Sequence, residues 1–189
     1  MIRILFALVF VSLIKAVEAN YNIEATKKGV EKREYNQSKQ QLIEAIYISE
    51  QAKDTIGLLK SLTAIEEIYS KLGQYDSAII VCYKRLNLNK IQKNYRSLSD
   101  NFRALNTLLI TNLDTNAASG LMDSCYHYAL LSGDSNTIIV ANTNYGSYKA
   151  GFDKALGLTY LNKAVAESIN CGSVIAYLYA RVQAAEILI

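Results

Sequence analysis

The sequence predicts an all-α protein, built as an α-solenoid in which antiparallel helix pairs stack on one another. Apolar residues recur at the spacing i, i+3, i+4, i+7 in successive segments, which is the period of one helix face. These segments return about every 40 residues along the chain. The 189 residues include no Pro, the residue that helix interiors tolerate least. One helix pair cannot bury both of its apolar faces alone, so we expect the pairs to stack.

The clearest helix pair lies within residues 57–96. Its first helix has the helical spacing at Leu62, Ile65, Glu66 and Tyr69. Gly73 is expected to end this helix, because Gly is favoured just beyond a helix C-terminus. The second helix starts near Tyr75 and repeats the spacing at Ile79, Cys82, Tyr83 and Leu86. Two helices joined by so short a turn form an antiparallel hairpin.

Small residues mark the period of the repeat. Where two helices cross closely, a large side chain would force their axes apart, so Ala, Ser or Gly is needed. Ala78, Ala118 and Gly157 hold this position in successive pairs, 40 and 39 residues apart. The chain beyond its first 19 residues is therefore divided into units of about 20–56, 57–96, 97–134 and 135–172, with a partial unit at 173–189.

The segment from Ile65 to Ala78, Ile-Glu-Glu-Ile-Tyr-Ser-Lys-Leu-Gly-Gln-Tyr-Asp-Ser-Ala, resembles the core of a tetratricopeptide repeat (TPR), and so does the segment from Gly157 to Val165. The period resembles the longer variant of this repeat, with about 40 residues instead of about 34. Unit 97–134 departs from the pattern, with Leu113 where Gly is usual and Cys125 where Ala is usual. The positions that carry the repeat structure are Tyr69, Gly73, Tyr75, Ala78, Ala118, Gly157 and Ala164.

The resemblance implies a concave surface that is lined by the first helix of each unit and binds a protein or a peptide. Residues on that helix that point away from its partner helix are the candidate contacts. They are Lys60, Thr63, Glu67, Ser70, Asp100, Arg103, Thr107, Ile110, Asn142, Gly146 and Lys149. The set is polar and mixed in charge, and the alternative interpretation is an ordinary solvated surface.

The first 19 residues have the order of a secretory signal peptide. Arg3 precedes an apolar run from Ile4 to Ile14, and Val17-Glu18-Ala19 places small side chains at the two positions that a signal peptidase inspects. A membrane-spanning helix needs about 20 apolar residues, and neither this run nor any other stretch is long enough. We therefore expect residues 1–19 to be removed and the protein to be exported to the periplasm or the cell exterior. The alternative is an uncleaved anchor on a cytosolic scaffold.

Composition and motifs argue against an enzyme, a metal site or a cofactor. The net charge of +3, from 20 Lys+Arg and 17 Asp+Glu, is too small and too evenly spread to predict nucleic-acid binding. His127 is the only His, so no second imidazole could help it to hold a metal. Cys82, Cys125 and Cys171 are interpreted as small core residues, and a disulfide between two of them stays open. The sequence has no phosphate loop, nucleophile elbow or zinc-helix motif.

These features predict a non-enzymatic domain that binds a protein or a peptide. The chain resembles the exported repeat regions that bacterial sensor and regulator proteins carry ahead of a membrane helix, so we expect the input region of such a protein. A free-standing secreted or periplasmic assembly scaffold is the alternative. Residues 184–189 end in mid-helix with apolar side chains. This favours a piece of a longer protein, and self-association through the uncapped helix stays open.

Overall fold

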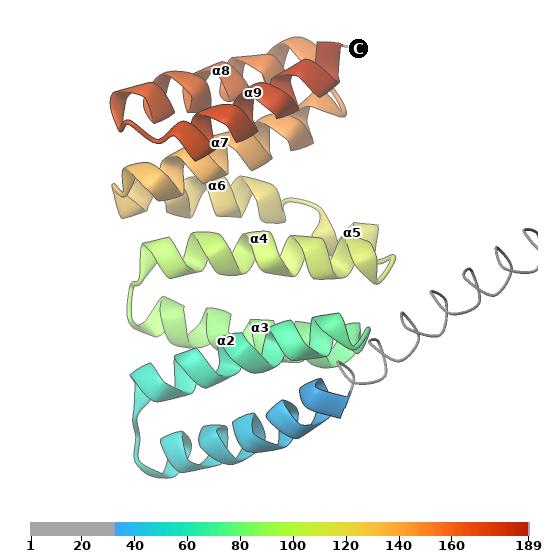
Figure 1. Ribbon diagram of the computed structural model, residues 1–189, viewed down its shortest axis with the longest axis vertical. Helices are drawn as coiled ribbons and strands as arrows, with labels where there is room; N and C mark the ends of the chain where they lie inside the picture. Colours follow the sequence, from blue (N-terminus) through green and yellow to red (C-terminus); the bar gives the residue numbers. More distant parts are fainter. Residues whose placement is uncertain (1–32, 189) are drawn as a thin grey trace, which may run out of the picture.

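The computed structural model describes residues 33–188, and within them it is all-α and contains no strand. The helices follow one another as a single stack (Figure 1). After a helix over 33–51 come α2 (Thr55–Lys71), α3 (Tyr75–Ile91), α4 (Tyr95–Thr111), α5 (Thr115–Ala118), α6 (Leu121–Ser132), α7 (Ser135–Ala150), α8 (Lys154–Asn170) and α9 (Val174–Leu188). The predicted α-solenoid of antiparallel helix pairs is confirmed. The expected signal segment, 1–19, lies outside the described residues.

Each helix packs against the next one along the chain, and helices two apart also meet where α7 contacts α4 and α9. The stack therefore has two layers. We call α2, α4, α7 and α9 the first layer, and the helix over 33–51 with α3, α6 and α8 the second layer. In Figure 1, α2 and α9 lie in front of α3 and α8, toward the viewer. The units expected at 57–96 and 97–134 begin at Thr55 and Tyr95.

The turns between helices repeat one local structure. The residue that follows the helix C-cap has a positive φ of 54° to 70° at Lys53, Gly73, Lys93, Leu113, Gly133 and Gly172. The next helix then starts at an N-cap whose carboxylate or amide oxygen accepts the backbone N–H three residues on. Asp54, Asn94, Asp114, Asp134 and Asp153 all do this, at 2.8–3.1 Å. Each cap satisfies one of the backbone donors that a helix start leaves unpaired.

Leu113 occupies a position where Gly is the least strained residue. Its φ is 62° and its side chain is 89% exposed, so it loses backbone freedom and gains little packing. Replacing Leu113 by Gly is expected to raise the free energy of unfolding by about 1 kcal/mol, because a left-handed backbone is strained by a Cβ atom. Urea denaturation measures the change. The reverse substitution at the equivalent turn, Gly73→Leu, should lower stability, and a less stable Leu113→Gly variant would contradict the turn geometry.

The second helix of unit 97–134 is broken where the apolar spacing predicted a continuous one. α5 ends at Ala118, Gly120 adopts a positive φ of 77°, and α6 begins again at Leu121. Only Gly takes this backbone conformation without strain. The break leaves the crossing residue Ala118 on α5 and the rest of the apolar face on α6.

The small residues lie at close helix crossings, as predicted. Ala78 and Ala164 are fully buried, and Ala118 is also in the core. Tyr69 and Tyr75 pack on the core cluster that contains Ala78 and Ala118. At the tightest crossing, a Cβ atom added to Gly157 would lie 2.5 Å from the Cβ and 2.7 Å from the Cα of Ala150 on α7. The backbones of α7 and α8 can approach this closely only because Gly has no side chain.

A buried ion pair joins α2 to α3 inside the stack. Glu66 shares the apolar face of α2, and it is buried there against the guanidinium of Arg85, which donates to its carboxylate. Arg85 also donates to Asn101 Oδ1 on α4 at 2.6 Å. Burial raises the pKa of Glu66, and Arg85 opposes this shift. Three successive helices are thus connected through one charged network, which the helical spacing alone did not reveal.

Candidate binding surface

The contacts expected on α2 and α4 lie together on one face of the first layer. Lys60, Thr63 and Glu67 are exposed on α2, and Ser70 is half-buried. On α4, Asp100, Thr107 and Ile110 are exposed and Arg103 is half-buried. Asp100 and Arg103 pair with each other at 3.8 Å. Such an exposed pair is weak, so both groups remain available to a ligand.

Two of the contacts expected on α7 are wrong. Asn142 is 3% exposed, and Gly146 is buried where a Cβ atom would meet Leu161 Cγ at 2.8 Å. Neither residue lies on the exposed face that α2 and α4 share. Gly146 instead lets α7 approach α8, as Gly157 does from the other side of the crossing.

A one-residue difference in the turn after α7 explains the error. In the turns after α2, α3 and α4, the N-cap N–H bonds to a carbonyl five residues back, as Gln74 does to Tyr69 at 2.8 Å. After α7, Asp153 bonds to Lys149, only four residues back, at 2.8 Å. The 39-residue period therefore applies to α8, whereas α7 keeps the 40-residue period, since its cap Asp134 is 40 residues after Asn94. A shift by one residue rotates a helix face by about 100°.

The corrected register places other side chains on the α7 part of this face. Val140, Thr143, Ser147 and Ala150 are the equivalents of the four residues of α4. Val140 is exposed, whereas Thr143 is buried at the approach to α9. Ser147 donates to Gln183 Oε1 on α9 at 2.8 Å, which ties these two first-layer helices together.

Lys149, the third contact expected on α7, is half-buried and bound to α6. Its ammonium lies 3.0 Å from Asp123 and 4.7 Å from the centroid of the Tyr145 ring. Tyr145 also donates to Asp123, at 2.5 Å. The Tyr145 hydrogen bond is the main cause that holds the pKa of Asp123 below its usual value, and bonds to Tyr145 and Asp123 raise the pKa of Lys149. The cluster fastens α6 to α7.

The first-layer face continues onto α9, which the sequence reasoning left out. Tyr179, Val182 and Glu186 are exposed there at the positions equivalent to Lys60, Thr63 and Glu67. We define the binding face as these three residues together with the exposed residues of α2, α4 and α7 described above. The signal that could have found them is the cap spacing, because Ser173 stands 20 residues after Asp153.

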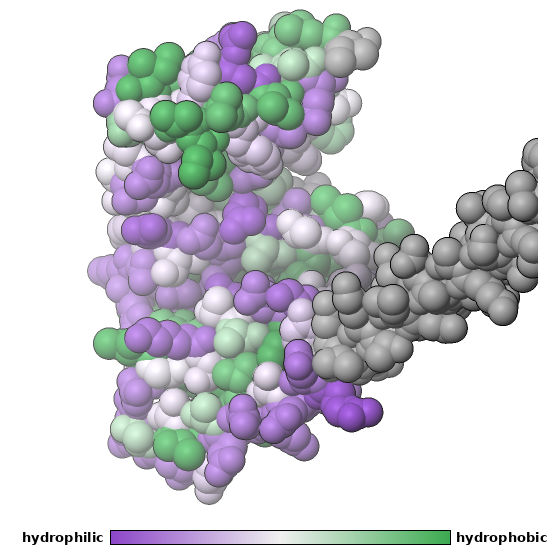
Figure 2. Space-filling view, in the orientation of Figure 1, coloured by the Kyte–Doolittle hydropathy of each residue, from purple (hydrophilic) through white to green (hydrophobic). Residues whose placement is uncertain are grey.

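The binding face changes from polar to apolar along the stack. A hollow of about 280 Å³ lies between α7 and α9, and it is lined mainly by apolar groups. Its lining residues are Asn136, Ile139, Val140, Thr143, Ser173, Ile175, Ala176 and Tyr179. Figure 2 shows hydrophobic side chains gathered over α9, whereas the surface over α4 is largely polar. Ile175, Leu178 and Val182 are among the exposed apolar residues of α9.

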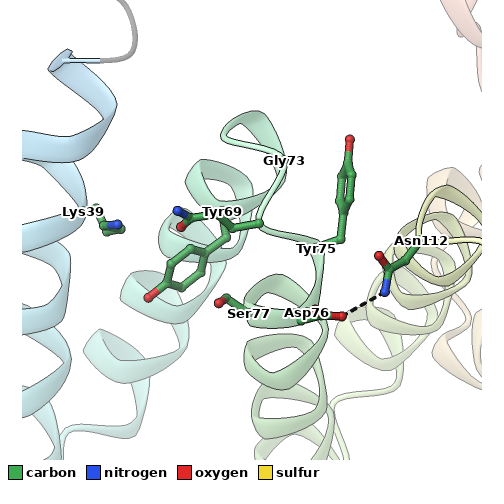
Figure 3. Close-up of a pocket in the computed structure, with 8 residues that line it drawn as sticks. Lys39, Tyr69, Gly73, Tyr75, Asp76, Ser77 and Asn112 are labelled. Carbon is green, nitrogen blue, oxygen red and sulfur yellow. Dashed lines mark hydrogen bonds between the residues drawn. The ribbon is translucent and has the colours of Figure 1, made fainter.

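A second hollow, of about 490 Å³, lies at the turn edge of the stack and is polar. Figure 3 shows its lining: Lys39 points from the helix over 33–51 toward Tyr69, while Asp76 at the start of α3 accepts from the Asn112 amide at 2.9 Å. Four elements contribute to it, the helix over 33–51, α2, α3 and the end of α4. This hollow can offer hydrogen bonds but few apolar contacts.

The cysteines and the histidine lie apart from the binding face. Cys82 and Cys125 are buried, as predicted, whereas the interpretation of Cys171 as a core residue is wrong, since it is exposed after α8. All three thiols are free. Burial is the main cause that raises the pKa of Cys82 to about 12. His127 is exposed on α6, and no group of three metal-binding side chains occurs within residues 33–188.

The part of the chain that the structure describes has no helix with the length and apolar character to span a membrane. Comparison with known proteins found no protein-family model that matches this chain and no curated protein that is similar to it.

Proposed function

We propose that this chain is a TPR-like repeat domain that binds a protein or a peptide along its first layer and carries out no catalysis. One observation carries the proposal: equivalent positions of α2, α4, α7 and α9 together form the continuous binding face. A surface that repeats along a stack suits an extended ligand, which can contact several units at once.

The chemistry of the binding face suggests the character of the ligand. Lys60, Glu67 and Thr107 offer charges and hydrogen bonds at one end, whereas the hollow beside Val140 and Tyr179 accepts an apolar side chain at the other. The ligand that fits is a segment with an aliphatic or aromatic residue at one end and polar residues at the other.

The setting that we propose is outside the cytoplasm, with the domain as the input region of a bacterial signalling or regulatory protein. The order of charge, apolar run and small residues in the first 19 residues supports this setting. A secreted assembly scaffold would use the same binding face.

Site-specific photo-crosslinking tests the proposed function. The crosslinking amino acid benzoylphenylalanine is placed at Thr107 or at Tyr179, both exposed on the binding face. The matched controls carry it at Asn87 on α3 or at Asn162 on α8, which are exposed on the second layer. After irradiation in the producing cell, mass spectrometry is expected to identify the same partner from both binding-face positions and not from the controls. A partner captured equally from the second layer would contradict the proposal.

A further inference from the structure

Aromatic rings fill the space between α3, α4 and α6. The rings of Phe102 and Tyr128 stack with centroids 5.4 Å apart, and Tyr95 lies 6.2 Å from Tyr128 on the same cluster. These rings pack against Leu86 of α3 and Cys125 of α6. Two neighbouring second-layer helices are thus sealed over the first-layer helix between them.

One unit further along, the same three positions are polar. With the 40-residue period of α7 and the 39-residue period of α8, Tyr95, Phe102 and Tyr128 correspond to Ser135, Asn142 and Glu167. The rings are absent, and a pocket of about 380 Å³ opens between α6 and α8 over α7. The residues that line it are Tyr126, Leu130, Ile138, Asn142, Lys163, Ala166, Glu167 and Asn170. Its volume is within the range of about 300–1,000 Å³ that small-molecule sites occupy.

Two hydrogen-bond acceptors of this pocket lack partners. Asn142 is 97% buried, and its Oδ1 atom has no donor within reach in the described structure. Buried carbonyl oxygens are rarely left unpaired, because the lost hydration is costly. Among residues 33–188, Glu167 forms no ion pair. The neighbouring ammonium of Lys163 is placed 4.8 Å from the centroid of the Tyr160 ring.

The remaining walls of the pocket are apolar. Leu130, Ile138 and Ala166 contribute aliphatic groups, and Tyr126 contributes its ring. That ring is fixed from behind, since it stacks on Tyr145 with centroids 4.6 Å apart and meets Tyr160 edge-on at 5.3 Å. A firm aromatic wall beside a carboxylate favours a cation with a flat or apolar body.

We propose that the pocket between α6 and α8 binds a small organic cation, an ammonium group attached to an aromatic or aliphatic body. The ammonium donates to Asn142 Oδ1 and to the Glu167 carboxylate, and the body takes the place that Phe102 and Tyr128 fill one unit earlier. The site lies on the second-layer side of α7 and is independent of the peptide-binding function proposed for the first layer.

A titration of the full chain with 2-phenylethylammonium chloride tests this site. Two-dimensional NMR of the ¹⁵N-labelled protein is expected to show saturable shifts at the backbone amides of Ile138, Asn142 and Ala166, with a dissociation constant of about 1 mM or below for so small a ligand. The neutral analogue 2-phenylethanol and the anion phenylacetate should bind at least about tenfold more weakly, because each lacks the charge that Glu167 attracts. Equal binding of all three probes, or no saturable shift, would overturn the proposal.

Two variants separate the cation site from general apolar binding. Glu167→Gln removes the charge and should weaken 2-phenylethylammonium about tenfold while leaving the binding of 2-phenylethanol unchanged. Asn142→Phe restores the ring of the preceding unit, so it should fill the pocket and abolish binding of every probe. Glu67→Gln, on the other layer, is the control that should bind as the parent chain does. Unaltered affinity in Glu167→Gln would overturn the proposal whether or not Asn142→Phe folds.

Discussion

Replacing Glu66 by Leu should lower the free energy of unfolding by about 3–5 kcal/mol, the largest loss that we expect from any single exposed-to-buried charge change in this chain. Glu66 and Arg85 are both buried, and Arg85 would keep only the Asn101 oxygen at 2.6 Å as a partner. An uncompensated guanidinium inside a stack of helices is far more costly than the lost contact itself. Chemical denaturation followed by circular dichroism measures the loss.

The double variant Glu66→Leu/Arg85→Met decides between a charge effect and a packing effect. With both charges removed, most of the lost stability should return, because well-packed apolar groups can replace a buried ion pair. The Asn101 amide would still lose a partner, so recovery should fall short of the parent chain. Glu67→Gln, one residue away and exposed, is the matched control with an expected change within about 0.5 kcal/mol. A double variant that is no more stable than Glu66→Leu would contradict the ion-pair explanation.

Gly157→Ala should destabilise the protein by about 1–3 kcal/mol, although Ala is normally the better helix former. The new methyl group would lie 2.7 Å from the backbone nitrogen and Cα of Ala150, and backbone atoms cannot yield as a flexible side chain does. The helices α7 and α8 must therefore separate, which also disturbs the contact of Gly146 with Leu161. Thermal unfolding of the variant measures the effect.

Gly151→Ala is the matched control for this crossing. Gly151 has φ −64°, an ordinary helical value, and the nearest atom to its added Cβ is the Tyr148 carbonyl oxygen at 3.4 Å. This substitution should leave stability unchanged or raise it slightly, because Ala restricts the unfolded chain. If Gly157→Ala were as harmless as Gly151→Ala, the close approach of α7 to α8 would be wrong.

The helices and most of their turns could be predicted because their signals are local. Apolar spacing marks one face of each helix, Gly73 follows a helix end, and Ala78 and Ala118 lie at crossings where the spacing places them. The N-cap residues gave a further local signal that the sequence reasoning did not use. Asp54, Asn94, Asp114 and Asp134 recur every 20 or 40 residues and would have shown the register of each helix.

The binding face was predicted on α2 and α4 and missed on α7 and α9. A single shortened turn before Asp153 separates the period of α7 from that of α8, and one residue is enough to turn a helix face by about 100°. Apolar spacing tolerates such a shift, because α7 is in contact with neighbours on several sides. Asn142 was for this reason expected on the wrong layer.

The sequence by itself determined the all-α class, the paired helices and the period, because these follow from the residues within each helix and turn. Only the tertiary structure decided which charges meet inside the stack, how closely α7 approaches α8, and where the aromatic filling gives way to a polar pocket. Glu66 and Arg85 are 19 residues apart, and Asn142 and Glu167 are 25 apart. Contacts over such distances depend on how helices rotate and stack, and no local pattern records this.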